Sequence, residues 1–355
     1  MRINVLVTSG GSAISQGIIK SLKASNLEKR IVVTDAQPYS AGLYRGDVAY
    51  LVPLAKDSNY IESIIEICKR ERIQAILIGM DYELLPLSKN RARIEYETGA
   101  KVIVSSPEII RISDDKFLTY NFLKNNNFPI IPSALYKDVD LLIKEEGFPL
   151  IIKPRIGDSS KNTFIVQNKK DLEEKIDFFL KNSELNPWLS KKVDPIIQKY
   201  IGTQNDEFTS TTIVFDRKSY GVISMQREMK YGGHTTKALI KQFPEINEQI
   251  KKVAEKLNPF GPCNFQSRII NGVPYIFEIN ARFSGTTPTC ALAGFNHVEA
   301  CLRKVVFGEE LQPLRYREGV MLRYFNEVFV SIEEIEKLKN EKKIKNPKSE
   351  VNMNF

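Results

Sequence analysis

The sequence predicts an α/β fold that opens with a doubly wound domain. Apolar strands alternate with amphipathic helical stretches over about the first 110 residues, which is the rhythm of a parallel sheet. The strand over residues 3–8 runs into a glycine-containing turn and a helix, as in a βα unit. At 355 residues the chain is too long for one ordinary core, so we expect two or three domains.

Bulk properties indicate an ordinary globular enzyme. No apolar run approaches the length of a membrane span, and residues 1–8 form a strand too short for a signal peptide. Four scattered cysteines lack metal-binding spacing and suit a reducing cytoplasm, where we expect the protein to work. Much of the net charge of +8 lies in the lysine-rich last 20 residues, a solvated helix and tail. We therefore expect neither nucleic acid nor membrane as a partner.

The first βα turn contains Gly10 and Gly11, and the next strand ends in Asp35. Glycines at such a turn let backbone N–H groups approach an anion at a helix N-terminus, the outline of a dinucleotide-binding domain. The spacing is Gly-Gly-x5-Gly rather than Gly-x-Gly-x-x-Gly, so the nicotinamide signal is weak. A tight βα turn is the more economical interpretation.

A second turn into a helix, residues 79–85, directly follows the buried strand over residues 75–79. Ligands of open α/β sheets collect at the carboxyl ends of strands, so Asp81 and Glu83 could recognise a cationic or hydroxyl-bearing substrate. Acids in a first helical turn also offset the helix dipole, and this alternative has equal weight.

The next two segments each contain a lysine of functional interest. Lys116 lies in a capped helix that begins near Ser113, and by itself would be a surface residue. Lys153 ends a run of buried apolar strand residues in the segment 147–154. Desolvating an ammonium costs several kcal/mol unless an anion meets it, so Lys153 is a strong functional candidate.

Strands dominate from residue 195 onward. Residues 207–215 form a strand that begins with Glu207, and another strand over 220–228 leads into the loop 230–237. That loop places His234 between a glycine pair and a threonine pair. A lone histidine is more often structural, as we expect for His297.

The face formed by Glu278, Asn280 and Arg282 is unusual. Side chains alternate along a strand, so these three residues point to the same side of residues 275–282. Hard divalent cations take carboxylate and amide oxygens, and Mg²⁺ usually shares them with phosphate oxygens. An arginine beside them suits a phosphoryl group in transfer. The alternative is a solvated strand face with an incidental ion pair.

The motif Glu-x-Asn-x-Arg-Phe-Ser-Gly, with a glutamine-bearing strand before it at residues 263–268, resembles the metal-binding hairpin of ATP-grasp ligases. The closest resemblance is to one synthetase unit of the carbamoyl-phosphate synthase large subunit. It covers roughly residues 1–310, with seven elements in the expected order. It implies a doubly wound pre-grasp domain over 1–112 and an ATP-grasp fold of two α+β subdomains over 113–310. Residues 311–355 would be a C-terminal extension, in which we see no function.

The same resemblance implies the internal division of the ATP-grasp fold, with a lid and lysine region over about 113–195 and a metal-binding region over about 196–310. The lid would be residues 155–163, and the adenine hinge would lie at the end of the strand that begins at Pro195. Glu207 would bind the ribose. The implied nucleotide contacts together are Lys116, Lys153, Ser159, Ser160, Lys161, Gln198, Lys199, Tyr200, Ile201, Glu207 and His234.

The implied cofactors are ATP and Mg²⁺ or Mn²⁺. Gln266 and Glu278 would hold the metal, Asn280 would complete a second metal site, and Arg282 would face the γ-phosphate. Lys153, Asn280 and Arg282 would be the catalytic residues. Gly10, Gly11, Asp81 and Glu83 would line the acceptor-substrate site.

The hairpin register decides whether Gln266 and Glu278 share a face. Asn271-Gly272 favours a two-residue turn, which would place Gln266 opposite Phe277 and facing away from Glu278. Metal binding by both therefore requires an odd loop or a bulge. We predict a three-residue loop, Asn271–Val273.

The implied activity is that of a carboxylate–amine or carboxylate–ammonia ligase, working through an acyl phosphate on a small metabolite, an amino acid or a sugar acid. A homodimer is compatible with this activity. One alternative is a nucleotide-binding regulatory protein without turnover, since Gln266 stands where many relatives have a carboxylate and the lid has one glycine where many have three. The other is an NAD(P)-dependent oxidoreductase, which leaves residues 278–287 unexplained.

Overall fold

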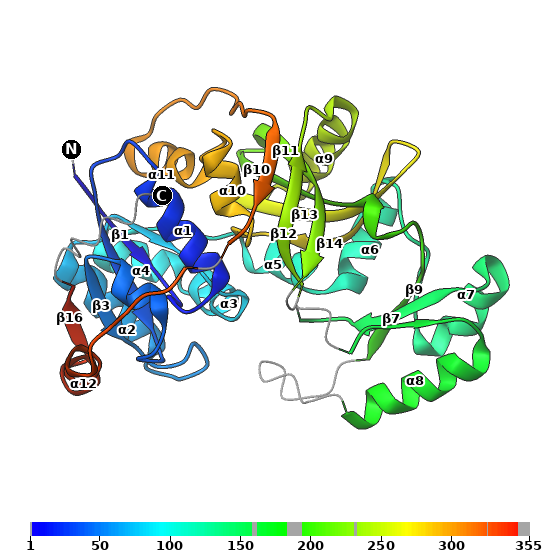
Figure 1. Ribbon diagram of the computed structural model, residues 1–355, viewed down its shortest axis with the longest axis horizontal. Coiled ribbons are helices and arrows are strands. Elements are labelled where there is room, and N and C mark those ends of the chain that lie inside the picture. Colours follow the sequence, from blue (N-terminus) through cyan, green and yellow to red (C-terminus); the bar gives the residue numbers. More distant parts are fainter. Residues whose placement is uncertain (1, 158–161, 183–193, 231–232, 325, 347–355) are drawn as a thin grey trace.

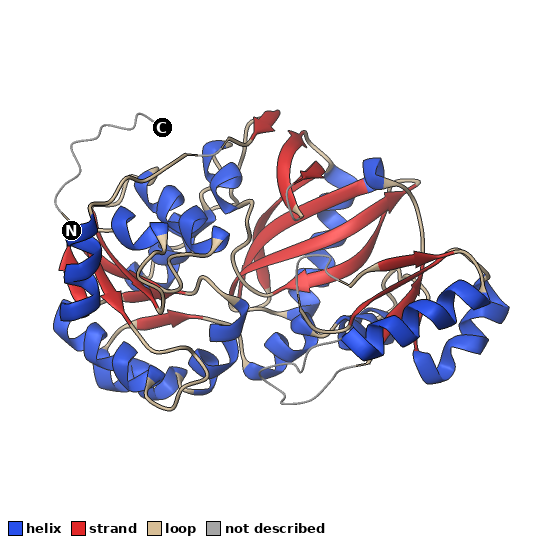
Figure 2. Cartoon of the chain, turned by 60° about the horizontal axis from the view of Figure 1, so that its bottom comes forward, coloured by secondary structure: helices blue, strands red, loops and turns tan. Residues whose placement is uncertain are grey.

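The computed structural model describes residues 2–157, 162–182, 194–230, 233–324 and 326–346. It confirms the expected fold class: a mainly parallel sheet with helices on both faces is followed by two antiparallel sheets (Figures 1 and 2). Within these ranges no helix combines the length and the apolar character needed to cross a membrane.

The N-terminal sheet has the strand order β16-β3-β2-β1-β4-β5, in which β1 to β5 are parallel. Strand β1 shows why it forms the centre, because Val5 and Val7 enter one apolar core while Leu6 enters another on the opposite face. The elements are β1 (Ile3–Val7), α1 (Ala13–Lys23), β2 (Lys29–Asp35), η1 (Ala41–Arg45), β3 (Val48–Leu51), α2 (Tyr60–Glu71), β4 (Ala75–Leu77), α3 (Asp81–Lys89), α4 (Arg91–Thr98), β5 (Lys101–Ile103) and α5 (Pro107–Asp114).

A smaller antiparallel sheet follows, with the strand order β6-β9-β7-β8. Helices α7 and α8 pack on it around a core that includes Leu150, Ile152 and Ile197. The elements are α6 (Lys116–Asn125), β6 (Ser133–Leu135), η2 (Tyr136–Asp138), α7 (Val139–Glu146), β7 (Leu150–Pro154), β8 (Phe164–Val166), α8 (Lys169–Asn182) and β9 (Pro195–Lys199).

The larger antiparallel sheet has the strand order β14-β13-β10-β11-β12-β15. Every residue of its central strand β10 is buried. Helix α9 covers one face of the strand, and α11 covers the opposite face near the N-terminal domain. The elements are η3 (Gln204–Asp206), β10 (Glu207–Phe215), β11 (Lys218–Lys230), β12 (His234–Ile240), α9 (Pro244–Leu257), β13 (Gly261–Ile270), β14 (Val273–Asn280), α10 (Thr287–Leu292) and α11 (His297–Phe307).

The C-terminal extension joins both halves of the molecule. Strand β15 (Gly319–Leu322) pairs with β12, whereas α12 (Ile332–Glu341) and β16 (Lys343–Lys345) return to the N-terminal sheet, where β16 pairs with β3. Glu71 anchors this return, since it accepts a hydrogen bond from Lys343 Nζ at 2.6 Å and one from Arg30 Nη2 at 2.5 Å. Part of the lysine-rich end is therefore paired rather than only solvated.

The hairpin β13–β14 corrects the predicted three-residue loop. Ile270 pairs with Val273, so Asn271 and Gly272 form a two-residue turn with φ values of +51° and +78°, as the Asn-Gly dipeptide favours. A β-bulge then shifts the register between Gln266 and Ser267, so that Gln266 pairs with Glu278. The bulge, rather than an odd loop, brings these two residues to one face.

Candidate functional site

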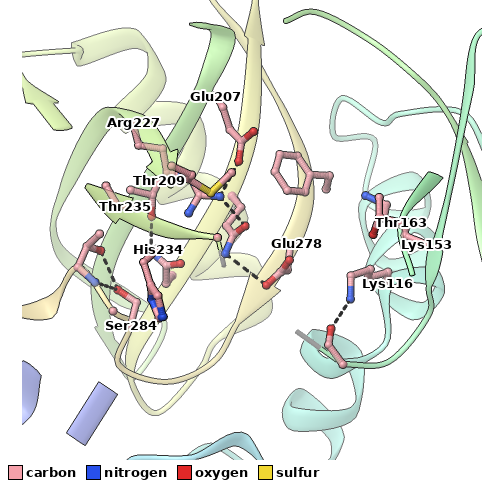
Figure 3. A pocket seen from close by; sticks show the side chains of 18 of the residues that line it. Lys116, Lys153, Thr163, Glu207, Thr209, Arg227, His234, Thr235, Glu278 and Ser284 are labelled. Atoms are coloured by element: carbon pink, nitrogen blue, oxygen red, sulfur yellow. Dashed lines mark hydrogen bonds and ion pairs between the residues drawn. The ribbon is translucent and has the colours of Figure 1, made fainter. Parts of the chain in front are cut away.

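A cavity of about 430 Å³ lies where the two antiparallel sheets meet the N-terminal domain. Figure 3 shows Lys116, Lys153 and Thr163 on one side and Arg227 and His234 on the other. Glu278 lies between these two sides. The N-terminal domain contributes the start of α1 and Asp81 at the start of α3. The cavity therefore unites residues from three separate parts of the chain.

The strand face predicted at residues 278–282 exists, and its side chains are linked. Asn280 Nδ2 donates to Glu278 Oε1 at 2.9 Å, and Arg282 Nη2 donates to Asn280 Oδ1 at 2.9 Å. Across the bulge, Gln266 Nε2 lies 3.3 Å from the same Glu278 oxygen. Gln266, Glu278 and Arg282 line the cavity, whereas Asn280 lies outside its described lining and accepts a hydrogen bond from Arg282. A ligand in the cavity therefore meets the oxygen atoms of Gln266 and Glu278 first.

Arg282 connects this face to the N-terminal domain. Its Nε and Nη2 atoms donate to the two carboxylate oxygens of Asp81 at 2.5 and 2.9 Å, a bidentate pair that fixes the plane of the guanidinium. Glu83, two residues further along α3, lies elsewhere. It is buried, accepts hydrogen bonds from Thr8 Oγ1 and Tyr60 Oη, and burial raises its pKa to about 7. The structure thus separates the two acids that the sequence grouped as substrate ligands.

The two lysines face the cavity from the smaller sheet. Lys116 is buried, and its Nζ donates to the carbonyl oxygen of Gly157 at 2.7 Å. Lys153 lies over the ring of Phe277, with Nζ 4.9 Å from the centroid. Burial, together with the nearby charge of Lys116, lowers the pKa of Lys153 to about 7. An anion between these ammonium groups would relieve both effects.

The segment 198–201, for which we predict the adenine hinge, forms part of the cavity wall. Gln198 is buried; its Nε2 donates to Ser133 Oγ at 2.7 Å, while its Oε1 has no hydrogen-bond partner among the described residues. The side chain of Lys199 turns away and donates to the carbonyl oxygens of Glu146 and Phe148. Tyr200 and Ile201 line the cavity, whereas Ser159, Ser160 and Lys161 lie outside the described residues.

Glu207 lines the cavity but is held by arginines. Arg227 Nη2 donates to it at 2.6 Å, and Arg268 Nη2 lies 3.5 Å from its other oxygen. Arg227 also donates to Gln266 Oε1 at 2.8 Å, so it bridges the predicted ribose and metal residues. His234, at the start of β12, lies on the same wall.

The glycine turn at the start of the chain is not part of the described cavity lining. Gly10 N donates to the carbonyl oxygen of Thr34, and Gly11 N donates to the carboxylate of Asp35 at 2.7 Å. The backbone N–H that could bind a dinucleotide phosphate is thus occupied by an acid. This arrangement favours the tight βα turn.

Sequence reasoning missed several cavity residues, among them Arg227, Arg268 and Arg323. Arg268 follows Gln266 by two positions on the same strand, which is the only local signal that could have found it. Arg227 lies on β11 and Arg323 directly follows β15, and both strands reach the cavity only through long-range pairing.

The oxygen atoms of Gln266, Glu278 and Asn280 fit a metal ion that takes its remaining ligands from water or from a bound nucleotide. No group of three or more His, Cys, Asp or Glu side chains suitable for a metal occurs among the described residues. Glu278 is one carboxylate with two amides beside it. Mg²⁺ commonly completes such a set with water and nucleotide phosphates.

Comparison with known proteins identifies the fold of this site. Residues 113–286 match the family model described as an ATP-grasp domain, and residues 5–103 match the PylC-like N-terminal domain. The chain contains an ATP-grasp domain. The resemblance inferred from the hairpin motif is thus confirmed, and the cavity lies between the two antiparallel sheets of this domain and the PylC-like domain.

Curated relatives include two carbamoyl phosphate synthase large chains. The one from Pseudothermotoga lettingae is 23% identical, and the match covers 88% of this chain and 29% of the relative. The one from a Thermoanaerobacter species is 24% identical, and the match covers 89% of this chain and 30% of the relative. The chain thus spans about 30% of the length of these relatives. Similar solved structures include N5-carboxyaminoimidazole synthetase of Staphylococcus aureus with ADP (TM-score 0.66, 16% identity, 89% of this chain and 81% of that one). The biotin carboxylase domain dimer of Hydrogenobacter thermophilus 2-oxoglutarate carboxylase, solved with MgADP, gives a TM-score of 0.65 at 19% identity and covers 89% of this chain and 71% of that one. These ATP-grasp structures share the fold.

Proposed function

We propose that this protein is an ATP-dependent carboxylate–amine or carboxylate–ammonia ligase that forms a C–N bond and releases ADP and phosphate. One observation carries the proposal: Gln266 and Glu278 present oxygen atoms to the same cavity as the ammonium groups of Lys116 and Lys153, and Asn280, outside the described cavity lining, is hydrogen-bonded to Glu278. A polyanion with a bound metal satisfies both sides of such a cavity.

The nucleotide subsite would lie between the hinge and the lysines. Gln198 Oε1 is a buried acceptor without a described partner, and an amino group of adenine would supply the missing donor. Ile131, Ile151 and Ile201 offer apolar surface for a base nearby. Lys116 and Lys153 would contact the phosphates, and Glu207 or His234 would approach the ribose.

Mg²⁺ or Mn²⁺ would be held by Gln266, Glu278 and Asn280 and would neutralise the phosphate charge when bound. Arg282 would bind the phosphoryl group in transfer, with its guanidinium kept in plane by Asp81. The carboxylate of the acceptor would then become an acyl phosphate, and an amine or ammonia would displace the phosphate. We propose a small metabolite, an amino acid or a sugar acid as acceptor, a cytoplasmic location and a homodimer as the assembly.

A second candidate is nucleotide binding without turnover, and one contact favours it. Gln266 Oε1, a predicted metal ligand, accepts a hydrogen bond from Arg227. A guanidinium on that oxygen competes with a metal and makes the site less negative than one with a second carboxylate.

The deciding experiment is ADP release measured against a matrix of carboxylates and amines with MgATP. We expect at least one pair to stimulate ADP release at least tenfold, and Glu278→Gln to abolish that stimulation. Gln keeps the size of the side chain but removes the charge that a metal requires. Glu245→Gln, at the exposed start of α9, is the matched control and should behave like the wild type.

Stimulated ADP release that survives in Glu278→Gln would contradict the metal assignment. ATP binding without stimulation by any pair would favour the regulatory alternative.

A further inference from the structure

Arg323 brings the C-terminal extension into the cavity. Its backbone N donates to the carbonyl oxygen of Thr236 at 2.8 Å, directly after the β12–β15 pairing. Met321, on the same side of the strand, packs against the apolar cluster that contains Met225 and Phe295. Two anchors therefore hold the position of Arg323, although the extension seemed from the sequence to have no function.

The guanidinium of Arg323 has no acidic partner among the described residues. Within that part of the chain its hydrogen bond is to the carbonyl oxygen of Gly285, at 2.5 Å. Burial lowers the pKa of Arg323. Arg282 in the same cavity instead forms a bidentate ion pair with Asp81. A partly buried cation without a counter-ion costs free energy, and an anionic ligand removes that cost.

The surroundings of Arg323 differ from those of the lysines. Ser284 and Thr286 add hydroxyl groups to the cavity wall on either side of Gly285, and Ser12 adds another from the start of α1. The positive charge continues along α1, where burial and the charges of Arg45 and Arg323 lower the pKa of Lys20. The charges that act on Lys153 are those of Lys116, Glu278, Glu207 and Arg268. Arg323 thus belongs to a second positive region, apart from the expected phosphate end.

We propose that Arg323 binds a second anionic group of the acceptor substrate, one that is not activated in the reaction. This inference rests on the proposed ligase function and narrows its substrate class. The acceptor would be a diacid, with one carboxylate beside Arg282 and another acidic group beside Arg323. Both a carboxylate and a phosphate suit a guanidinium that still has free N–H donors.

The test is calorimetric titration of the full chain, with ADP and Mg²⁺ in excess, by succinate in one series and by inorganic phosphate in another. The variants are Arg323→Gln, Arg323→Lys and the control Arg317→Gln. Arg317 lies in the same extension, and its Nη2 donates to the carbonyl oxygen of Leu292, but it is exposed and outside the described cavity lining. Melting temperatures check that every variant is folded.

We expect at least one anion to bind the wild type and Arg317→Gln equally, and to bind Arg323→Gln at least about tenfold more weakly. Arg323→Lys keeps the charge and should lose less. Tighter succinate binding identifies a carboxylate as the second group, and tighter phosphate binding identifies a phosphate. Equal binding to the wild type and Arg323→Gln, or binding of neither anion to the wild type, overturns the proposal.

Turnover provides a separate readout. With the best pair from the acceptor matrix, Arg323→Gln should raise the KM of the acceptor at least about tenfold and leave the KM of ATP unchanged. A rise in the KM of ATP instead would overturn the assignment. Wild-type protein that releases no ADP with any acceptor would refute the proposed ligase function. The proposal for Arg323 would still be tested separately, because the anion titrations require no turnover.

Discussion

Lys153 offers a quantitative test of the nucleotide subsite. Burial and the charge of Lys116 lower its pKa to about 7 in the free protein. A phosphate beside it would restore the pKa to roughly 10.4, the value of an unperturbed lysine. The protonated form then binds the nucleotide better than the neutral form. Raising the pH above 7 must therefore weaken binding, and each binding event must take up protons.

The expected magnitudes follow from these two pKa values. With a pKa of about 7, the free protein carries the Lys153 proton in roughly a quarter of molecules at pH 7.5 and in roughly 3% at pH 8.5. Binding should take up about 0.75 proton at pH 7.5 and about 0.95 at pH 8.5. Between pH 7.5 and pH 9 the affinity should fall about 20-fold, which is about 1.8 kcal/mol.

Calorimetry in two buffers of different ionisation enthalpy measures the proton uptake, with ADP and a chelator so that no metal contributes. Lys153→Arg is the matched control, because its guanidinium stays protonated and should bind with little dependence on pH. Uptake below about 0.2 proton by the wild type at pH 8.5, or an equal uptake by Lys153→Arg, would refute the reasoning.

Other residues give further predictions. Arg282→Ala should lower ADP release at least about 10²-fold, since it removes the cation expected at the transferring phosphoryl group, while exposed Arg315→Ala should not; steady-state assays decide. Glu71→Gln should lower the free energy of unfolding by about 1–2 kcal/mol at pH 7. Burial alone would raise the pKa of Glu71, but hydrogen bonds from Lys343, Tyr50 and Arg30 lower it to about 2. Its contribution is therefore present above about pH 4.5 and lost as the pH falls toward 2. Urea unfolding should show a difference between the two proteins at pH 7 that shrinks to about a quarter of its size at pH 2.5.

Local chemistry made part of the site predictable. Lys153 was found because an ammonium at the end of an apolar strand needs an anion, and the structure places it in the cavity. Glu278, Asn280 and Arg282 were grouped by strand alternation, and their side chains are hydrogen-bonded to one another. Such inferences depend only on neighbours within a few residues.

Local chemistry could not distinguish Asp81 from Glu83, because two roles were equally acceptable for both. Asp81 and Glu83 both fit a first helical turn, but a helix advances about 200° over two residues. Asp81 therefore meets Arg282 in the cavity while Glu83 enters the interior with Tyr60. The direction of each side chain follows from how α3 packs, which local sequence does not encode.

The sequence by itself determined the order of the elements, the alternation of the strands and the residue types able to meet a polyanion, because these depend on the periodicity and the solvation of single segments. The tertiary structure decided the rest. A bulge in β14, opposite Gln266, brought Glu278 to the same face as Gln266. The pairing of β15 with β12 brought Arg323 to a cavity whose other walls lie far away along the chain. Register and long-range pairing are set by the packing of whole sheets, and that packing is a property of the folded molecule.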